Sequence, residues 1–501
     1  MNALSIGTQR QLFIDDRLME QHEGVVLTPN PPDKAGLVEL QTPASGHVCV
    51  VEYQGRFFMY YRDTQDFAGM NVALSEDGIT WTNPEPPLVL PGVGAGSVFI
   101  DPHATDERPF KALLDINCAS RWGMDPAMTG RAVPAGRTQA AALGGMFLFR
   151  SRDGIEWEIV PQMALPFLCD THNQVFHDTR LDRYVAYLRG FPEQESMPHR
   201  YKRVVVRTET PDLMAMPWPH TPNPLNVPDP RHKYPYIGDE MEIVMAADEH
   251  DPPRTDLYNP CMHLYPYAAD AYLAFPSMYR NFDNTPSYGR DLRGLGSNSG
   301  LFEVHLAVSR DGHTFYRYRT PYVRCGMIRD RKGYDGEPDC GLIMMGIGMV
   351  RAGDKLYQYY HGAGRIHGGR SVAEDSMFPT GGVFRVVQRL DGFVSADTDH
   401  SGGELTTPVI QFEGNGLYLN ADCGGLGEIQ VEIRDPDGSA LPGYALDEAV
   451  SIDRNGTAQE IWWRNGPDVS ALAGRPIRLH FKMRSSKLYA FQFVARSQPM
   501  S

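Results

Sequence analysis

The heptapeptide Ser75-Glu-Asp-Gly-Ile-Thr-Trp81 recurs along the chain as Ser151-Arg-Asp-Gly-Ile-Glu-Trp157 and Ser309-Arg-Asp-Gly-His-Thr-Phe315. A weaker copy is Arg389-Leu-Asp-Gly-Phe393. The Asp-Gly pairs of these four segments begin at Asp77, Asp153, Asp311 and Asp391. The intervals are therefore 76, 158 and 80 residues, and 158 is twice 79. One copy is missing from the middle of the series, so the chain is predicted to hold five repeats of roughly eighty residues.

The missing copy is expected where the strand-like Arg203-Val-Val-Val-Arg207 is followed by Thr208-Glu-Thr210 and Trp218. Each repeat also contains a short apolar strand that leads through a turn into a strand rich in aromatic residues. Asp-Gly favours a tight turn with positive φ between such strands. Units of three or four antiparallel strands at this period are typical of propeller blades. The sequence predicts an all-β chain with a five-bladed β-propeller, in which Gln11-Leu-Phe-Ile14 completes a blade.

The residue pattern changes after Ser395, and the segment from Asp397 to Gly403 is predicted to be a linker. Short alternating strands follow, among them Ile429-Gln-Val-Glu-Ile433 and Ile477-Arg-Leu-His-Phe481. This pattern predicts a C-terminal β-sandwich. The expected division is a catalytic propeller over residues 1–395 and a β-sandwich over residues 396–501.

Composition narrows the classes of function. A formal charge of -15 over 501 residues disfavours nucleic acid and anionic membranes as partners. No apolar run approaches the roughly 18 residues that span a bilayer, and no leader pattern begins the chain, which favours a cytoplasmic protein. Seven scattered cysteines without a CxxC pair indicate buried thiols rather than disulfides or a zinc site. No cofactor or metal is indicated, and oligomeric state is left open.

A five-bladed propeller followed by a β-sandwich resembles glycoside hydrolase family 32, and the propeller alone is similar to the family 43-type arabinanases and xylosidases. The resemblance, carried by the architecture and the Ser-x-Asp-Gly-x-x-Trp motif, implies an exo-acting or oligosaccharide-processing glycosidase, with furanosides among the candidate substrates. The first repeat has Ala44-Ser-Gly-His-Val48 where those enzymes carry an aspartate, and no Glu-Cys motif is present. The catalytic trio of those families is therefore not transferred.

Ligands of a propeller bind at one end of the central channel, so candidate residues are sought where each innermost strand begins. The densest such segment holds Asp170, His172 and Asn173, and Asp170 is the first choice for a catalytic base or nucleophile. The alternative is that Asp170 and Asn173 only cap a loop through the backbone.

Further carboxylates come from two other segments. Glu337 and Asp339 precede the fifth inner strand, and either is a candidate to protonate the leaving group. Glu242, beside Glu240, is an alternative acid at the head of the insertion from Pro217 to Asp256. Glycosidases use two carboxyl groups, about 5–5.5 Å apart for retention and roughly 6.5–9.5 Å for inversion.

Residues near other predicted strand ends are candidates for sugar binding. They are His172, Asn173, His263, Tyr265, His361, Arg365 and, as a stacking aromatic, Trp122. The expected partner is an oligosaccharide or glycoside. Two alternatives stay open: a polysaccharide lyase that uses His, Tyr and Arg, and a glycan-binding protein without catalysis.

Overall fold

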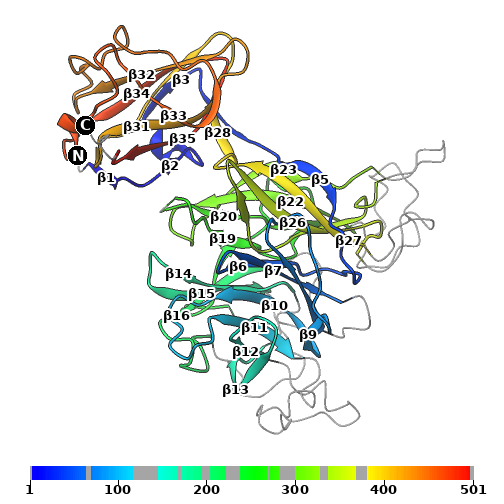
Figure 1. Ribbon diagram of the computed structural model, residues 1–501. Helices are drawn as coiled ribbons and strands as arrows, with labels where there is room; N and C mark the ends of the chain where they lie inside the picture. Colours follow the sequence, from blue (N-terminus) through cyan, green and yellow to red (C-terminus); the bar gives the residue numbers. More distant parts are fainter. Residues whose placement is uncertain are drawn as a thin grey trace, which may run out of the picture. The chain divides into compact units, whose positions relative to one another are not determined.

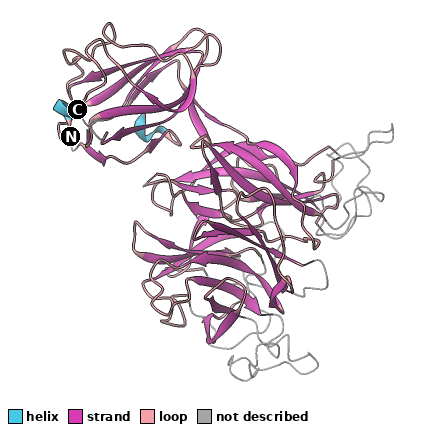
Figure 2. Cartoon of the chain, in the orientation of Figure 1, coloured by secondary structure: helices cyan, strands magenta, loops and turns pink. Residues whose placement is uncertain are grey.

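The computed structural model describes residues 3–63, 69–116, 145–167, 171–192, 203–221, 237–268, 270–281, 300–327, 337–367 and 381–496. These residues form strands and loops, and the helices assigned among them are short (Figures 1 and 2), including the 3-10 turns η1 (Asp16–Leu18) and η6 (Ser470–Leu472). The prediction of an all-β chain is confirmed for this part of the chain. None of its helices is long and apolar enough to cross a membrane.

Internal contacts divide the chain into two compact units. The larger unit contains residues 32–263 and 272–387, and the smaller contains residues 1–31, 264–271 and 388–501. This division differs from the expected boundary near Ser395, because the N-terminal residues belong with the C-terminal ones. Sequence periodicity does not reveal such pairing, since the strands concerned are hundreds of residues apart.

The larger unit holds five antiparallel sheets that follow one another along the chain. The first contains β6 (Cys49–Tyr53), β7 (Arg56–Arg62), β8 (Gly69–Ser75) and β9 (Leu88–Pro91). The second contains β10 (Val93–Ile100), β11 (Phe110–Ile116), β12 (Met146–Ser151) and β13 (Trp157–Leu165). The third contains β14 (Gln174–Asp178), β15 (Arg183–Gly190), β16 (Val204–Thr210) and β17 (Glu242–Met245).

The fourth and fifth sheets are less regular. The fourth contains β18 (Thr255–Leu257), β19 (Met262–Leu264), β20 (Tyr272–Ala274), β21 (Ser277–Asn281), β22 (Gly300–Ser309) and β23 (Tyr316–Val323). The fifth contains β24 (Leu342–Met345), β25 (Val350–Ala352), β26 (Lys355–Ala363), β27 (Gly382–Arg389) and β5 (Asp33–Leu37). The strand that the N-terminal region adds to a sheet of this unit is therefore β5, and not the segment Gln11–Ile14.

Hydrogen bonds link β6, β10, β14, β19 and the residues that follow β24 in a cycle, one segment from each sheet. Cys49 Sγ donates to the carbonyl of Val98, the amide of Val175 to Ser97 Oγ, and the amide of Met262 to Gln174 Oε1. Cys261 Sγ then donates to the carbonyl of Gly346, and the amide of Val50 to the carbonyl of Ile347. One strand of each of the five sheets is thus joined in a closed ring, which we call the ring of first strands although in the fourth sheet β18 precedes β19.

The repeated heptapeptide forms the same turn in all three clear copies. In the first, Ser75 Oγ accepts from the amide of Gly78, and Asp77 Oδ1 accepts from the amides of Ile79 and Thr80 at 2.7 and 2.8 Å. The copies at residues 151–156 and 309–314 repeat these bonds. Asp and Ser satisfy the backbone locally, which explains why these residue types recur.

The glycine of each clear copy also joins two sheets. The carbonyls of Gly78, Gly154 and Gly312 accept hydrogen bonds from the hydroxyls of Tyr359, Tyr60 and Tyr187, which lie in β26, β7 and β15 of neighbouring sheets. A Cβ atom on Gly154 would lie 2.6 Å from Tyr60 Oη, and its φ is +77°. Glycine is required here both for the backbone angle and for the close approach.

The degenerate copies differ. In the third sheet Thr210 and Asp212 replace Ser and Asp: the amide of Asp212 donates to Thr210 Oγ1, and the amide of Met214 to Asp212 Oδ1. The weak copy at residues 389–393 instead buries Asp391, whose carboxylate accepts from Tyr265 Oη at 2.7 Å and pairs with Arg10 at 3.0 Å. These bonds lie within the smaller unit.

The smaller unit contains two larger sheets and one parallel pair. One sheet is built from β4 (Val26–Pro29), β28 (Val394–Thr398), β35 (Ser486–Val494), β31 (Gly416–Asp422), β33 (Asn455–Glu460) and β2 (Gln11–Leu12). The other is built from β3 (Gln21–Glu23), β29 (Gly403–Thr406), β34 (Arg478–Arg484) and β32 (Glu428–Arg434), and β1 (Leu4–Gly7) pairs with β30 (Ile410–Phe412). Inward residues such as Phe13, Phe481 and Phe491 form its core.

Five of the seven cysteines lie among the described residues, and all five are free thiols. Cys49, Cys261, Cys340 and Cys423 are buried, and Cys325 is half-buried. Burial raises the pKa of Cys49 to about 12 and that of Cys423 to about 11, which makes them unreactive. The expectation of buried thiols is confirmed for these four positions.

Candidate functional site

Four histidines gather around the ring of first strands. His47 and His172 directly precede β6 and β14, and their rings stack with centroids 5.3 Å apart. His263 lies in β19 and His361 in β26. A Cβ atom on Gly46 would lie 3.9 Å from His361 Nδ1, so this glycine permits close packing of the strands around the imidazoles. We call His47, His172, His263 and His361 the channel histidines.

Three of the channel histidines, His47, His172 and His263, are held in a neutral state. Burial lowers the pKa of His172, with a further contribution from His263, to about 3, and burial alone lowers that of His263 to about 3. Burial also lowers the pKa of His47 well below its usual value, and repulsion by Arg62, His172, His361 and Arg189 adds to this effect. A neutral imidazole has one donor and one acceptor nitrogen, so it recognises hydroxyl groups rather than charges.

Several buried polar atoms here have no hydrogen-bond partner among the described residues. They are His47 Nδ1, His172 Nε2 and both side-chain atoms of Asn259, whose residue is only 1% exposed. An unpaired buried polar group costs about 1–3 kcal/mol, so native proteins keep few of them without a reason. Donor and acceptor atoms in this state are suited to receive a polar ligand.

A set of hydrogen bonds to the backbone fixes the chain on both sides of His172. Arg189 Nη2 donates to the carbonyl of Tyr258 at 2.6 Å and its guanidinium stacks on the Tyr258 ring at 4.2 Å. Thr171 Oγ1 donates to the same carbonyl at 3.1 Å. Asn173 bonds only backbone in the contacts observed, with Nδ2 on the carbonyl of Thr171 and Oδ1 on the amide of Arg189. These contacts correspond to the loop-capping alternative for Asn173.

A buried ion pair between Arg203 and Asp256, which lies in β18 of the fourth sheet, stabilises the same region. Arg203 Nη1 and Asp256 Oδ2 are 2.5 Å apart, and the Arg203 guanidinium packs against the rings of Tyr258 and Tyr279. Burial raises the pKa of Asp256 to about 6, although Arg203 and Arg189 act in the opposite direction. The pair holds the segment that precedes Asn259.

The carboxylates expected before the fifth inner strand lie next to each other. Asp339 is buried and its Oδ2 accepts from Lys34 Nζ at 2.6 Å and from Tyr360 Oη at 2.7 Å. Glu337 is exposed and accepts from the amide of Met327. A Cβ atom on Gly326 would be closer than 3 Å to one carboxylate oxygen of each, so those oxygens are within roughly 6 Å of each other.

Asp339 and His361 lie on different faces of the fifth sheet. A Cβ on Gly362 would contact Asp339, and a side chain on the adjacent His361 points to the opposite face of the strand. The structure therefore does not bring Asp339 directly to the channel histidines. Asp170 and Trp122 lie outside the described residues, and their roles stay predictions.

The other predicted residues have different surroundings. Glu242 lies on β17, the last strand of the third sheet, where it pairs with His313. Tyr265 belongs to the smaller unit and binds Asp391. Arg365 is half-buried and follows β26. None of these three is brought to His172 by a contact among the described residues.

Sequence analysis missed Arg62, Arg189 and Asn259. It centred on the segments where the first strands begin, but the second strand of each sheet is antiparallel and ends at the same edge. Arg62, for example, donates its amide to the carbonyl of Gly46, next to His47. Charged residues at the ends of the second strands were the available signal.

No family model matches the chain, and no curated protein matches it in sequence. Among solved structures, an N-acetylgalactosamine deacetylase from F. plautii has a TM-score of 0.43 and 12% identity, covering 73% of this chain and 96% of its own. A family 43 arabinoxylan arabinofuranohydrolase from Bacillus subtilis has a TM-score of 0.35 and 12% identity, covering 91% and 96%. A thermostable family 43 glycoside hydrolase has a TM-score of 0.38 and 13% identity, covering 71% and 90%.

Glycoside hydrolases, family 43 among them, are thus among the solved structures to which this chain is similar, as the sequence resemblance implied. The resemblance to family 32 stays a prediction. Identities of 12–13% and TM-scores below 0.5 do not assign the chain to a family.

Proposed function

We propose that the chain is a glycoside hydrolase in which the five sheets are the blades of a β-propeller and the smaller unit is a β-sandwich. The observation that carries this proposal is the set of buried polar atoms on His47, His172 and Asn259 that have no hydrogen-bond partner among the described residues. A sugar hydroxyl both donates and accepts hydrogen bonds. It is therefore matched by a neutral imidazole and a carboxamide.

The electrostatics favour an uncharged sugar over a uronate. The histidines are neutral because burial lowers their pKa values, and Arg189 already binds the carbonyl of Tyr258. A lyase acting on uronates needs cationic groups free to pair with a carboxylate. A neutral glycoside or oligosaccharide is the substrate class that this site supports.

The proposed chemistry uses Asp170 and Glu337. Asp170 stands two residues before His172, and we assign it the role of base or nucleophile at the anomeric carbon. Glu337 is the proposed acid that protonates the leaving oxygen, because it is exposed while Asp339 is occupied by Lys34 and Tyr360. The adjacent Asp339 would orient the segment that carries the acid. This division follows the two-carboxyl requirement of glycoside hydrolysis.

The experiment is a turnover assay on a panel of aryl furanosides and pyranosides. Asp170→Asn and Glu337→Gln are expected to lower kcat/KM by about 10²–10⁴-fold on the substrate that the wild type accepts. Asp354→Asn, in the exposed turn between β25 and β26, is the matched control and should retain wild-type activity.

The outcomes distinguish the alternatives. Undiminished turnover in both variants would remove the catalytic assignment. An unsaturated, ultraviolet-absorbing product would indicate a lyase. A glycan that raises the melting temperature without being turned over by the wild type would indicate a binding protein.

A further inference from the structure

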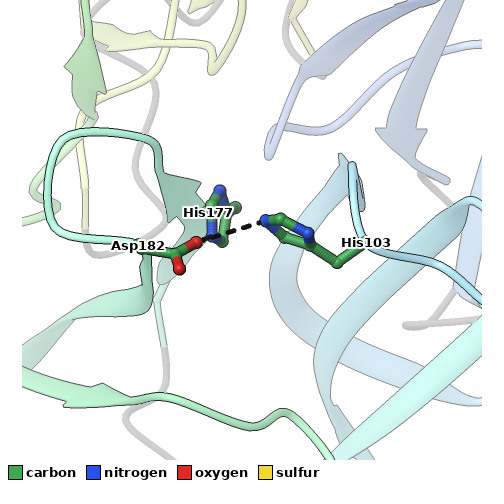
Figure 3. Close-up of side chains that lie close together, drawn as sticks. All are labelled: His103, His177 and Asp182. Carbon is green, nitrogen blue, oxygen red and sulfur yellow. Dashed lines mark ion pairs between the residues drawn. The ribbon is translucent and has the colours of Figure 1, made fainter.

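A second group of histidines lies at the other end of β14. His177 is in β14, His103 is in the turn between β10 and β11, and Asp182 is in the turn between β14 and β15. One ligand atom from each residue lies within 4.8 Å of the others. Figure 3 shows both imidazoles directed towards the Asp182 carboxylate. From this geometry we propose that His103, His177 and Asp182 bind a divalent zinc ion that cross-links the second and third sheets.

The distances from the two imidazoles to the Asp182 carboxylate fit a tetrahedral ion. His103 Nε2 and His177 Nε2 lie 3.4 and 3.3 Å from Asp182 Oδ1. Zinc binds imidazole nitrogen and carboxylate oxygen at about 2.0–2.2 Å, which places neighbouring tetrahedral ligands about 3.3–3.5 Å apart. Both contacts are longer than the usual 2.7–3.2 Å of an N–H···O hydrogen bond. The spacing suits an ion between these atoms better than a direct bond.

The two turns that carry the ligands are fixed before any ion binds. The amide of His103 donates to Asp101 Oδ1 at 2.9 Å, and Tyr184 Oη donates to the same oxygen at 2.7 Å. The amide of Arg180 donates to Asp178 Oδ1 at 2.9 Å. A site held in rigid turns loses little conformational entropy when the ion enters.

Burial provides a second, independent observation. The His177 side chain is only 5% exposed, so one ligand of the site is shielded from solvent. His103 and Asp182 are 55% and 83% exposed, so an ion can enter from solvent and keep a water as fourth ligand. Two imidazoles and one carboxylate favour zinc over calcium or magnesium, which prefer oxygen ligands.

The test is zinc binding to the untagged full-length chain, measured by competition with a chromogenic chelator and by the visible bands of bound cobalt. The wild type is expected to bind one equivalent at this site. His103→Ala and Asp182→Asn, which change exposed side chains, should each raise the Kd at least about tenfold. His250→Ala replaces another exposed histidine, beside Glu249, and should leave zinc binding unchanged.

A wild type that binds no zinc would overturn the proposal. So would zinc binding that is the same in the wild type, His103→Ala and Asp182→Asn, because the ion would then occupy a different site. Calcium should not displace the bound zinc, and displacement by calcium at equal concentration would also contradict the assignment.

Discussion

The two histidine clusters occupy opposite ends of one short strand. His172 precedes β14 and His177 lies near its end, roughly 16 Å further along at strand geometry. His172 is buried against His47, and its Nε2 has no partner in the described part of the chain, whereas His177 faces the exposed pair His103 and Asp182. The same residue type is therefore a neutral hydrogen-bonding group at one end and a candidate metal ligand at the other.

The difference arises from burial and from the nearest charges. Arg62 and Arg189 act on the channel cluster through His47, which disfavours both the imidazolium and a metal cation. Asp182 supplies a negative charge to the second cluster, which is also open to water. An imidazole near cations and shielded from water loses its proton, whereas one near a carboxylate can bind a cation.

The largest expected effect is a pH dependence of the free energy of unfolding, which arises from the buried histidines of the first cluster. His172 and His263 have pKa values of about 3 when folded and about 6.5 when unfolded, so the unfolded chain binds more protons below pH 6.5. Stability should fall as the pH falls from about 6.5 towards 3, by about 2 kcal/mol for each of these histidines between pH 7 and 5. Asp256 acts in the opposite sense, because its raised pKa favours the folded state at lower pH.

Chemical denaturation at pH 7 and pH 5 measures this effect. His172→Gln should reduce the pH dependence, whereas His250→Ala should preserve it, since the His250 side chain is 72% exposed. Equal pH dependence in the wild type and His172→Gln would show that His172 is not held neutral by the fold.

The next largest effect is the loss of packing. His172→Ala should lower the free energy of unfolding at pH 7 by about 2–3 kcal/mol, because it opens a cavity beneath His47. His103→Ala, measured with a metal chelator present, should change it by no more than about 0.5 kcal/mol, because the side chain is exposed. Similar losses of unfolding free energy in both variants would contradict the proposed difference in burial between the two clusters.

The smallest effect concerns Asn259, whose amide atoms have no partner among the described residues. Asn259→Leu should leave stability unchanged or raise it by about 1 kcal/mol, because a buried unpaired amide is removed. It should weaken binding of the sugar ligand by about fivefold to tenfold. Thermal denaturation with and without ligand checks both parts. A destabilised variant that retains full affinity would assign Asn259 a structural role only.

Local features were predictable from the sequence because their hydrogen bonds close within a few residues. The Ser-x-Asp-Gly turns are the clearest case: Asp77 bonds the amides two and three positions ahead, and the same residues at Asp153 and Asp311 do the same. The five repeats and the all-β composition follow from these turns. His172, His263 and His361 were also selected, because the ends of strands can be located by their pattern; His172 precedes β14, and His361 lies near the end of β26.

Features that depend on register between distant strands were not predictable. Arg189 and Thr171, the neighbour of His172, meet at the carbonyl of Tyr258, next to Asn259, only because of the antiparallel pairing and the closed ring of first strands. Residues 1–31 joined the C-terminal unit because β2, β3 and β4 found partners in β35, β29 and β28. Pairing of this kind is decided by side-chain packing across hundreds of residues, which a pattern along one chain does not record.

The sequence by itself determined the repeat, the turn that closes it and the strand-rich character of the chain, since these rest on neighbours in the chain. Tertiary structure alone decided which histidines meet. His47 and His172 stack across 125 positions of sequence, and His103 meets His177 and Asp182 across a sheet boundary. The physical reason is that ring closure and strand register bring these side chains together, and both depend on the whole unit being folded.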